Sequence, residues 1–322
     1  MTPPPPPPRP LTTIRAADIQ DPAPETPPWL VEQLWGRGAV GVIGGAPKSC
    51  KSWLALELAV AVASGRPCLG RFAVAAAAPA PVLLYSAEDT AMQVRRRLEE
   101  LCLARGTTLA SLMLELIVEP SLRIDRAEDV ARLRATLSLR KPTLLILDPY
   151  VRLQRADENN ATEVAAILAT LRALSREFGT ALLLVHHARK SPGEHSGATL
   201  RGSSDFHAWG DSNLYLRRRA QELVLTVEHR AAAAPPPLTL ALADNPLHLE
   251  IRDNPQIYDS QVPVQNSLEE RLLALLADGP RRLEDLRSAV GARKQYVSQA
   301  LRTLATSGHV VRNADGWTRP RV

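Results

Sequence analysis

The segment from Gly41 to Ala55, GVIGGAPKSCKSWLA, constrains the fold of this 322-residue chain more than any other. An apolar run at residues 39–43 leads into a short segment with glycine and proline, and a periodic apolar run follows. This order predicts a strand, a loop and a helix. Such a loop directs backbone amide groups at an anion beside a helix N-terminus, so the segment predicts a phosphate-binding turn. The alternative is a glycine-rich turn that binds no ligand.

The spacing of the loop residues matches the motif G-x-x-x-x-G-K-[ST] at Gly45, Lys51 and Ser52. In that motif the lysine reaches the β- and γ-phosphates of a nucleotide, and the hydroxyl joins the coordination of Mg²⁺. Cys50 occupies the position of the second glycine, where a side chain in a left-handed conformation costs roughly 1–2 kcal/mol. The expected nucleotide contacts are Gly45, Lys48, Ser49, Cys50, Lys51 and Ser52.

The composition is that of a globular protein. With 45% hydrophobic residues the chain can bury a large core, and we expect one large and one small domain. The three cysteines are too few and too irregularly spaced for a disulfide framework or a zinc site, which favours the reducing cytoplasm. No secretion signal is present and the apolar stretches are too short to span a membrane, so we expect no membrane partner. The net charge of +5 permits a polyanionic partner without requiring one.

Two further apolar runs end in carboxylates. The run PVLLYS is followed by Glu88 and Asp89, and the run KPTLLILD ends in Asp148. If these strands are parallel to the first, their carboxyl ends meet beside the phosphate loop. Glu88 is then placed to polarise an attacking water, and Asp89 and Asp148 are placed to join the Mg²⁺ shell. The alternative is helix capping, with Asp89 as the cap and Glu88 as a favourable partner of the helix dipole.

A third apolar run, ALLLV at residues 181–185, stops at His186 and His187. A histidine here either senses the γ-phosphate or packs as an ordinary polar residue. Farther along, Arg201 lies in a Gly/Ser segment from which it can reach a nucleotide in a neighbouring subunit as an arginine finger. The alternative is a surface arginine or one that orders the loop. Strands that alternate with helices and end in polar groups predict an α/β fold with a doubly wound, mainly parallel sheet.

Changes in composition divide the chain into four parts. We expect a proline-rich disordered tail over residues 1–28, the phosphate-binding domain over 29–252, a polar linker over 253–265 and a small domain over 266–322. Late in the large domain, alternating residues predict a strand at 211–216 that pairs with one at 223–227.

The small domain has the pattern of three short helices followed by residues that alternate around a turn. This order matches a winged helix-turn-helix. Ten basic and six acidic residues give this domain a net charge of +4, which favours DNA as its partner, and the alternative is a protein-interaction module. The expected DNA contacts are Arg293, Lys294, Gln295, Gln299 and Arg302.

Five motifs in order, GGAPKSCKSWLALELA, YSAEDT, LLILDPY, LLLVHHARK and LRGSSD, resemble one family. It is the RecA-fold AAA ATPases similar to the RepA hexameric replicative helicase of mobilisable plasmids, and the resemblance covers roughly residues 29–252. It implies a RecA-like P-loop NTPase core and an ATP site between subunits of a ring. The winged helix is an addition to this pattern.

The resemblance also implies a role for each motif residue. Lys51 and Ser52 would bind phosphate and Mg²⁺, Glu88 would act as the catalytic base, and Asp148 would lie in the metal shell. His187 or His186 would sense the γ-phosphate. Arg201 would act as the finger of a neighbouring subunit.

These inferences predict an oligomeric ATPase, expected to be a hexamer, that couples hydrolysis to movement on DNA or to its remodelling. Single-stranded DNA would pass through the ring and duplex DNA would bind the winged helix. The alternative is a DNA-binding regulator that ATP assembles and that hydrolyses slowly or not at all. A third interpretation is a scaffold with a degenerate site, in which the acidic pair at residues 88–89 only caps a helix.

Overall fold

We describe the protein from a computed structural model. The described residues are 13–18, 28–74, 79–154, 161–187, 204–219, 222–252, 268–277, 279–290, 294–307, 309–313 and 316–320. The chain divides into two compact units, residues 1–252 and 253–322, and each is treated separately. The predicted tail and linker lie largely outside the described residues. Among the described helices, none combines the length and the apolar character that crossing a membrane requires.

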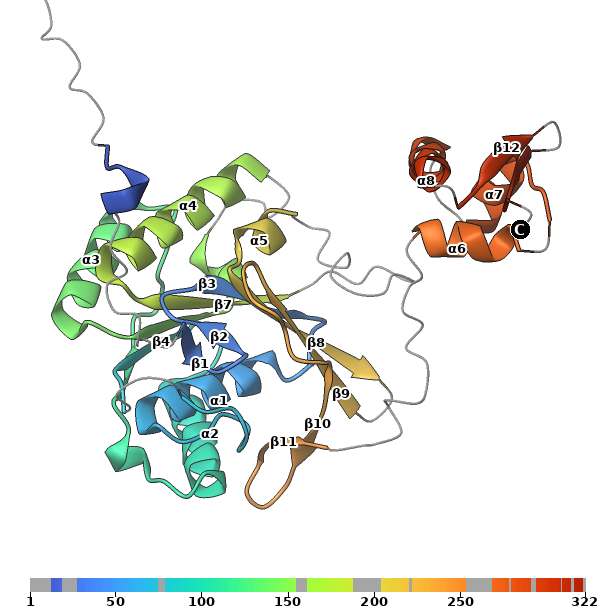
Figure 1. Cartoon of the computed structure of the whole chain (residues 1–322). Helices are drawn as coiled ribbons and strands as arrows, with labels where there is room; N and C mark the ends of the chain where they lie inside the picture. Colours follow the sequence, from blue (N-terminus) through green and yellow to red (C-terminus); the bar gives the residue numbers. More distant parts are fainter. Residues whose placement is uncertain are drawn as a thin grey trace, which may run out of the picture. The chain divides into compact units, whose positions relative to one another are not determined.

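A nine-stranded sheet forms the centre of the first unit, in the order β11-β10-β9-β8-β3-β7-β6-β4-β5 (Figure 1). The strands from β8 to β5 in this order are parallel, whereas β8 to β11 pair antiparallel. The sheet strands are β3 (Val40–Gly45), β4 (Val82–Ser86), β5 (Leu114–Ile117), β6 (Leu144–Asp148), β7 (Ala181–His187), β8 (Ser212–Arg219), β9 (Glu222–His229), β10 (Leu238–Ala243) and β11 (His248–Ile251).

Helices cover both faces of this sheet (Figure 1). Residues of α1 and α2 pack in one hydrophobic cluster, and residues of α3, α4 and α5 pack in the other. The helices are α1 (Lys51–Ser64), α2 (Ala91–Ala104), α3 (Ala127–Arg140), α4 (Ala161–Phe178) and α5 (Ser204–Trp209). Three short turns of 3-10 helix, η1 (Ala16–Asp18), η2 (Leu109–Ser111) and η3 (Tyr150–Leu153), and a hairpin of β1 (Trp29–Val31) and β2 (Trp35–Gly36) complete the unit.

The apolar runs that predicted strands are continuous because both sheet faces are buried. In β6, Leu144 and Ile146 pack on the α1 side while Leu145 and Leu147 pack on the α3 side. A strand covered on both faces has no polar side to present, so its sequence lacks alternation. The predicted α/β class with a mainly parallel sheet is confirmed.

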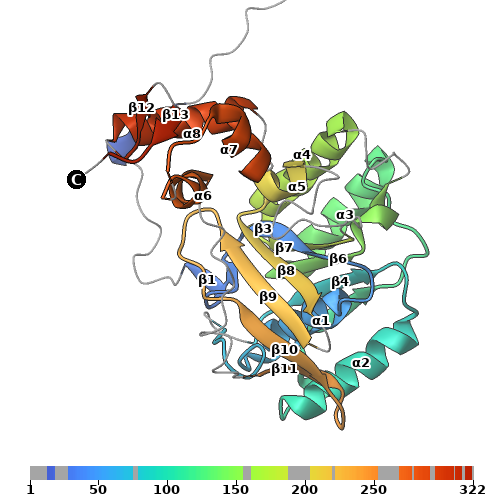
Figure 2. The ribbon, with the colours of Figure 1, turned by 90° about the vertical axis from the view of Figure 1, so that its right-hand side faces the viewer.

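The helix after the phosphate loop is buried on nearly all sides. Eleven of the fourteen residues of α1 are buried, which explains why apolar residues occur on all of its sides. The antiparallel strands contribute to this burial, because β11 reaches α1 and α2 along the curved edge of the sheet (Figure 2). The β1–β2 hairpin adds Leu30, Leu34 and Trp35, which are buried in the same cluster.

The strand pairing predicted at residues 211–216 and 223–227 is present as β8 and β9, which extend farther than the pattern indicated. Two regions differ from the sequence expectations. Residues 204–209, for which no helix was predicted, form helix α5, whose Phe206 and Trp209 are buried in the same cluster as residues of α4. No expectation covered β5 and α3, whose apolar residues are interrupted by charge.

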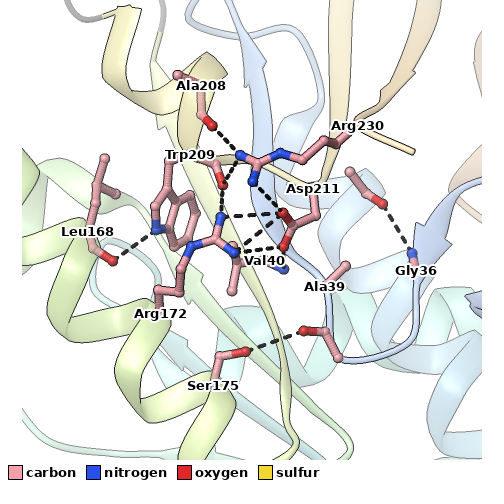
Figure 3. Close-up of polar contacts among 12 residues, drawn as sticks. Gly36, Ala39, Val40, Leu168, Arg172, Ser175, Ala208, Trp209, Asp211 and Arg230 are labelled. Carbon is pink, nitrogen blue, oxygen red and sulfur yellow. Dashed lines mark hydrogen bonds and ion pairs between the residues drawn. The ribbon is translucent and has the colours of Figure 1, made fainter. Parts of the chain in front are cut away.

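An arginine–carboxylate network fixes β8 beside the amino end of β3 (Figure 3). Asp211 donates its amide to the carbonyl of Val40 and accepts the amide of Val40 with Oδ2, at 2.7 and 3.3 Å. Arg172 and Arg230 both contact the Asp211 carboxylate, at 3.0 and 3.4 Å. This network lies at the opposite end of β3 from the phosphate loop, so it holds the sheet that presents the loop.

The second unit contains three helices and a small hairpin. The elements are α6 (Leu268–Leu275), α7 (Leu283–Val290), α8 (Lys294–Thr306), β12 (Val311–Asn313) and β13 (Gly316–Thr318). Leu272, Leu286 and Leu301 are among the residues that form a core of their own. Arg281 and Trp317 exchange backbone hydrogen bonds of 2.9 Å, so the hairpin is attached to the segment between α6 and α7.

Candidate active site

The phosphate loop joins the end of β3 to α1 in a conformation that favours glycine. Lys48 and Cys50 both have positive φ values, 60° and 62°. The backbone at Cys50 is therefore left-handed, as the motif requires, and the cysteine side chain does not cap the helix. Gly45 is required for another reason: a Cβ atom there would lie 2.3 Å from the carbonyl oxygen of Leu216 on β8.

Lys51, the first residue of α1, is buried inside the loop. Its Nζ donates to the carbonyl of Ala46 at 2.7 Å, and the hydroxyl of Ser49 donates to the same oxygen at 2.8 Å. Burial lowers the pKa of Lys51 to about 8, although the negative charges of Asp148 and Glu88 act in the opposite direction. A cation held partly desolvated at a helix N-terminus is well placed to receive an anion.

Asp148 ends β6 next to the phosphate loop. It is buried and paired in register with Ser86, the last residue of β4. Burial raises the pKa of Asp148 to about 6; the hydrogen bond from the Ser52 hydroxyl and the charge of Lys51 oppose this rise, while Asp89 and Glu88 add to it. The structure therefore brings the predicted lysine, serine and acids together at one edge of the sheet.

Glu88 and Asp89 follow β4 and are both engaged by arginines. Glu88 is exposed, and its Oε1 lies 3.0 Å from Nε of Arg152 on η3. Asp89 receives both Nη atoms of Arg97 on α2, at 2.6 and 3.1 Å. The guanidinium of Arg97 also lies over the ring of Trp53, 5.7 Å from its centroid.

The capping alternative for the acidic pair is wrong for Asp89. Thr90 is the N-cap of α2: its hydroxyl accepts the amide of Gln93 at 3.3 Å, and the Gln93 side chain accepts the amide of Thr90 at 2.8 Å. This capping box satisfies the helix end without either acid. The carboxylates at residues 88 and 89 are thus not needed to cap α2.

The histidine pair lies at the end of β7, which is paired with the last residues of β3. The His186 ring is buried, stacks on Phe206 with a centroid distance of 4.2 Å, and meets Tyr150 edge-on at 5.9 Å. This position fits the packing alternative for His186. The backbone of His187 completes β7, but its side chain lies outside the described residues, as does all of Arg201.

The predicted DNA contacts belong to the second unit. Arg302 is exposed on α8. Lys294, Gln295 and Gln299 lie on the same helix, but their side chains are outside the described residues, as is all of Arg293.

Sequence reasoning missed three arginines at this edge of the first unit, Arg97, Arg152 and Arg218. Arg218 lies on β8, and its Nη2 donates to the carbonyl of Lys48 at 3.3 Å. The run Arg217-Arg218-Arg219 at the end of a strand beside β3 was the available signal. Nothing in the local sequence marked Arg97 and Arg152, because their partners are 8 and 64 residues away.

Comparison with known proteins agrees with this geometry. The family model described as "AAA domain" matches residues 4–193, more than half of the chain. That range contains the phosphate loop, the acidic strand ends and β7.

Two solved structures share the fold. A solved ATPase domain aligns with a TM-score of 0.52 and 14% identity over 67% of this chain and 86% of that chain. A DnaB-like replicative helicase, described with its interactions with primase, aligns with a TM-score of 0.50 and 14% identity over 66% of this chain and 57% of that chain. The first unit therefore has the RecA-like P-loop ATPase fold seen in DnaB-like helicases.

Proposed function

This chain belongs to the AAA domain family, and on that premise we propose that it binds ATP with Mg²⁺ and hydrolyses it. The observation that carries the proposal is the meeting of Lys51, Ser52 and Asp148 at the mouth of one phosphate loop. Burying a lysine beside a hydroxyl and a carboxylate costs free energy of folding, because charged groups lose their hydration. A loop that served only as a turn would not need such a group of residues.

The residues present fit Mg²⁺. The Ser52 hydroxyl and the Asp148 carboxylate supply hard oxygen ligands close enough to influence each other, and Mg²⁺ in nucleotide sites takes one or two such protein ligands beside phosphate oxygens and water. When bound, the cation would neutralise phosphate charge. Asp89 remains a proposed outer partner of this shell, although Arg97 occupies both of its oxygens.

Each of the predicted site residues would have a separate role in hydrolysis. Lys51 would exchange the Ala46 carbonyl for oxygens of the β- and γ-phosphates, and the α1 amides would receive the phosphates. Glu88 is exposed and would accept a proton from the attacking water. Arg201 of a neighbouring subunit would stabilise the charge that develops, and His187 would respond to the γ-phosphate.

We propose that the ATPase works as a ring on DNA. The likeness of the first unit to a solved ATPase domain and to a DnaB-like replicative helicase supports a homo-oligomer, and we propose a hexamer. We propose that the second unit is a winged helix-turn-helix that binds DNA, and its three helices, its hairpin and the net positive charge of residues 266–322 support this proposal. We propose that duplex DNA is bound by Arg293 and by four residues of α8, which are Lys294, Gln295, Gln299 and Arg302.

A switch without turnover is the second candidate. Cys50 supports it, because the left-handed position in the loop carries a side chain where close phosphate approach favours glycine. In that case ATP would assemble the ring on DNA, and hydrolysis would be slow or absent.

Steady-state ATP hydrolysis by the wild type and by Lys51→Ala, each with Mg²⁺ and measured without DNA, with single-stranded DNA and with duplex DNA, tests the proposal. We expect turnover that DNA stimulates and that falls at least about 100-fold in Lys51→Ala. Arg66→Ala, which removes an exposed positive charge, serves as the matched control. Equal turnover in wild type and Lys51→Ala would refute the ATPase assignment. ATP binding without turnover would favour the switch.

Salt-dependent DNA binding tests the second unit separately. We expect deletion of residues 266–322 to weaken duplex binding and to flatten its dependence on salt, because fewer counterions are released. Unchanged binding would identify the unit as a protein-interaction module.

A further inference from the structure

Strand β8 runs directly beside the phosphate loop. It pairs with β3 in parallel, with Gly45 opposite Leu216, and the Leu216 carbonyl fills the space where a Cβ of residue 45 would lie. The chain of β8 continues past this contact, so Arg218 lies alongside the loop residues that follow Gly45. The position of this arginine is therefore set by sheet register.

Arg218 contacts the two loop residues whose backbone is least favourable. Its Nη2 donates to the carbonyl of Lys48 at 3.3 Å, and its guanidinium is near enough to Cys50 for its charge to oppose the rise in the pKa of that thiol that burial causes. Both contacted residues are non-glycine residues with positive φ. A left-handed backbone is disfavoured for residues with a Cβ, so this conformation of the loop is higher in free energy than it would be with glycine at these positions.

We propose that Arg218 is a positioning residue that holds the phosphate loop in its anion-receiving conformation and compensates for the cysteine at position 50. The inference rests on the proposed function, because the conformation matters only if the loop binds a nucleotide. If the loop occupies its nucleotide-binding conformation only part of the time, the apparent affinity for the nucleotide falls in proportion to that fraction. A guanidinium that fixes the Lys48 carbonyl, two residues before Cys50, raises the competent fraction.

This role differs from direct phosphate recognition in one measurable way. If Arg218 acts through the loop, its importance depends on what occupies position 50. Glycine adopts the left-handed conformation readily, so the loop of Cys50→Gly needs less support. If Arg218 instead bound a phosphate, its loss would weaken binding equally with either residue at position 50.

Nucleotide affinity in a double-mutant cycle tests the proposal. The proteins are the full-length wild type, Arg218→Ala, Cys50→Gly and the double variant, titrated with a fluorescent ATP analogue and Mg²⁺. We expect Arg218→Ala to weaken binding about fivefold in the wild-type background, as loss of a hydrogen bond to the loop implies, and less than about twofold in the Cys50→Gly background. Arg219→Ala, an exposed arginine on the same strand, is the control and should change affinity little.

Equal losses in the two backgrounds, or no loss in either, would overturn the positioning role. Hydrogen exchange of the backbone amides of residues 48–52 in the nucleotide-free proteins tests the same idea without a ligand. We expect faster exchange in Arg218→Ala than in the wild type or Arg219→Ala, and unchanged exchange would overturn the proposal. If the wild type bound no nucleotide, the proposed function would fail, and the exchange rates alone would still decide whether Arg218 holds the loop.

Discussion

Nε of Arg152 lies 3.0 Å from Oε1 of Glu88, and this contact joins the turn after β6 to the loop after β4. Both side chains are about half exposed, at 60% and 45% of their full accessibility. An exposed ion pair adds at most about 1 kcal/mol to stability. The contact matters more for the direction in which it holds the Glu88 carboxylate than for the fold.

We expect Glu88→Gln to lower the rate of ATP hydrolysis at least about 100-fold, because an amide cannot accept a proton from the attacking water. Nucleotide affinity should stay within about threefold of the wild type, since Glu88 is not expected to contact phosphate. Single-turnover hydrolysis and equilibrium titration measure the two quantities. Turnover retained in Glu88→Gln would remove Glu88 from the role of base.

Arg152→Ala should lower kcat by about three- to tenfold, because the Glu88 carboxylate is then no longer held in one direction. Nucleotide affinity should stay the same, and the free energy of unfolding should change by no more than about 0.5 kcal/mol. Arg134→Ala, which removes the exposed arginine of the 3.0 Å pair with Glu177, is the matched control. The same kcat in both variants would mean that the Arg152 pair is only a surface contact.

Much of the fold was predictable because its signals are local. The apolar runs that precede Asp148 and His186 are buried on both sheet faces, and a strand buried in this way can be recognised by its continuous apolar sequence. The left-handed conformation expected at Cys50 is present for a similar reason, since the motif that surrounds it dictates the turn.

The parts that were missed depend on distant partners. Helix α5 is only six residues long, and its Phe206 and Trp209 are buried in the same cluster as residues of α4, which stabilises it. The alternative interpretation of Asp89 as a helix cap is wrong because Thr90 and Gln93 form a capping box one residue later. The contact of Arg218 with Lys48 follows from the order of strands in the sheet, which the sequence does not reveal.

Asp148→Asn should stabilise the nucleotide-free protein at pH 7 by roughly 1–3 kcal/mol while it impairs Mg²⁺-dependent hydrolysis. Burial raises the pKa of Asp148 from 3.8 to about 6. Between these values the folded protein keeps a proton that the unfolded chain has lost, so the free energy of unfolding falls as the pH rises. The lost attraction for Lys51 offsets part of the gain in the variant.

Urea unfolding at several pH values checks this sign. The advantage of Asp148→Asn should be full well above pH 6 and should vanish well below pH 3.8, where the carboxyl is protonated in both states. Asp244→Asn, at an exposed carboxylate, is the control. An advantage that does not depend on pH would show that packing, and not ionisation, is responsible.

Cys50→Gly should raise the free energy of unfolding by about 0.5–1 kcal/mol, because the relief of left-handed strain exceeds the extra entropy of glycine in the unfolded chain. Cys50→Ala separates this effect from loss of the thiol. Alanine has the same Cβ penalty as cysteine, so it should give no gain. Thermal unfolding of the three nucleotide-free proteins is the measurement, and equal gains in both variants would contradict the strain argument.

Arg105→Ala should destabilise the first unit by about 3–5 kcal/mol, because it leaves the buried carboxylate of Glu57 without its cation. Nε of Arg105 lies 2.5 Å from Oε1 of Glu57, whose side chain is fully buried, and Nη2 donates to the Leu249 carbonyl on β11 at 2.9 Å. Burial raises the pKa of Glu57, and Arg105 opposes that rise. The arginine thus ties α2 to both α1 and the antiparallel edge of the sheet.

The matched control is Arg95→Ala on α2, the helix that ends just before Arg105. Arg95 pairs with Glu99 at 2.9 Å, but both side chains are exposed, so this variant should lose at most about 0.5 kcal/mol. The double variant Glu57→Met/Arg105→Met should recover most of the stability that Arg105→Ala loses, because apolar side chains remove the buried charge altogether. In Arg105→Ala alone the loss should grow as the pH rises, since Glu57 must then either keep its proton or be buried as an unpaired anion. A loss that is small, or the same at every pH, would mean that water reaches Glu57 and that the ion pair does not hold α2 in place.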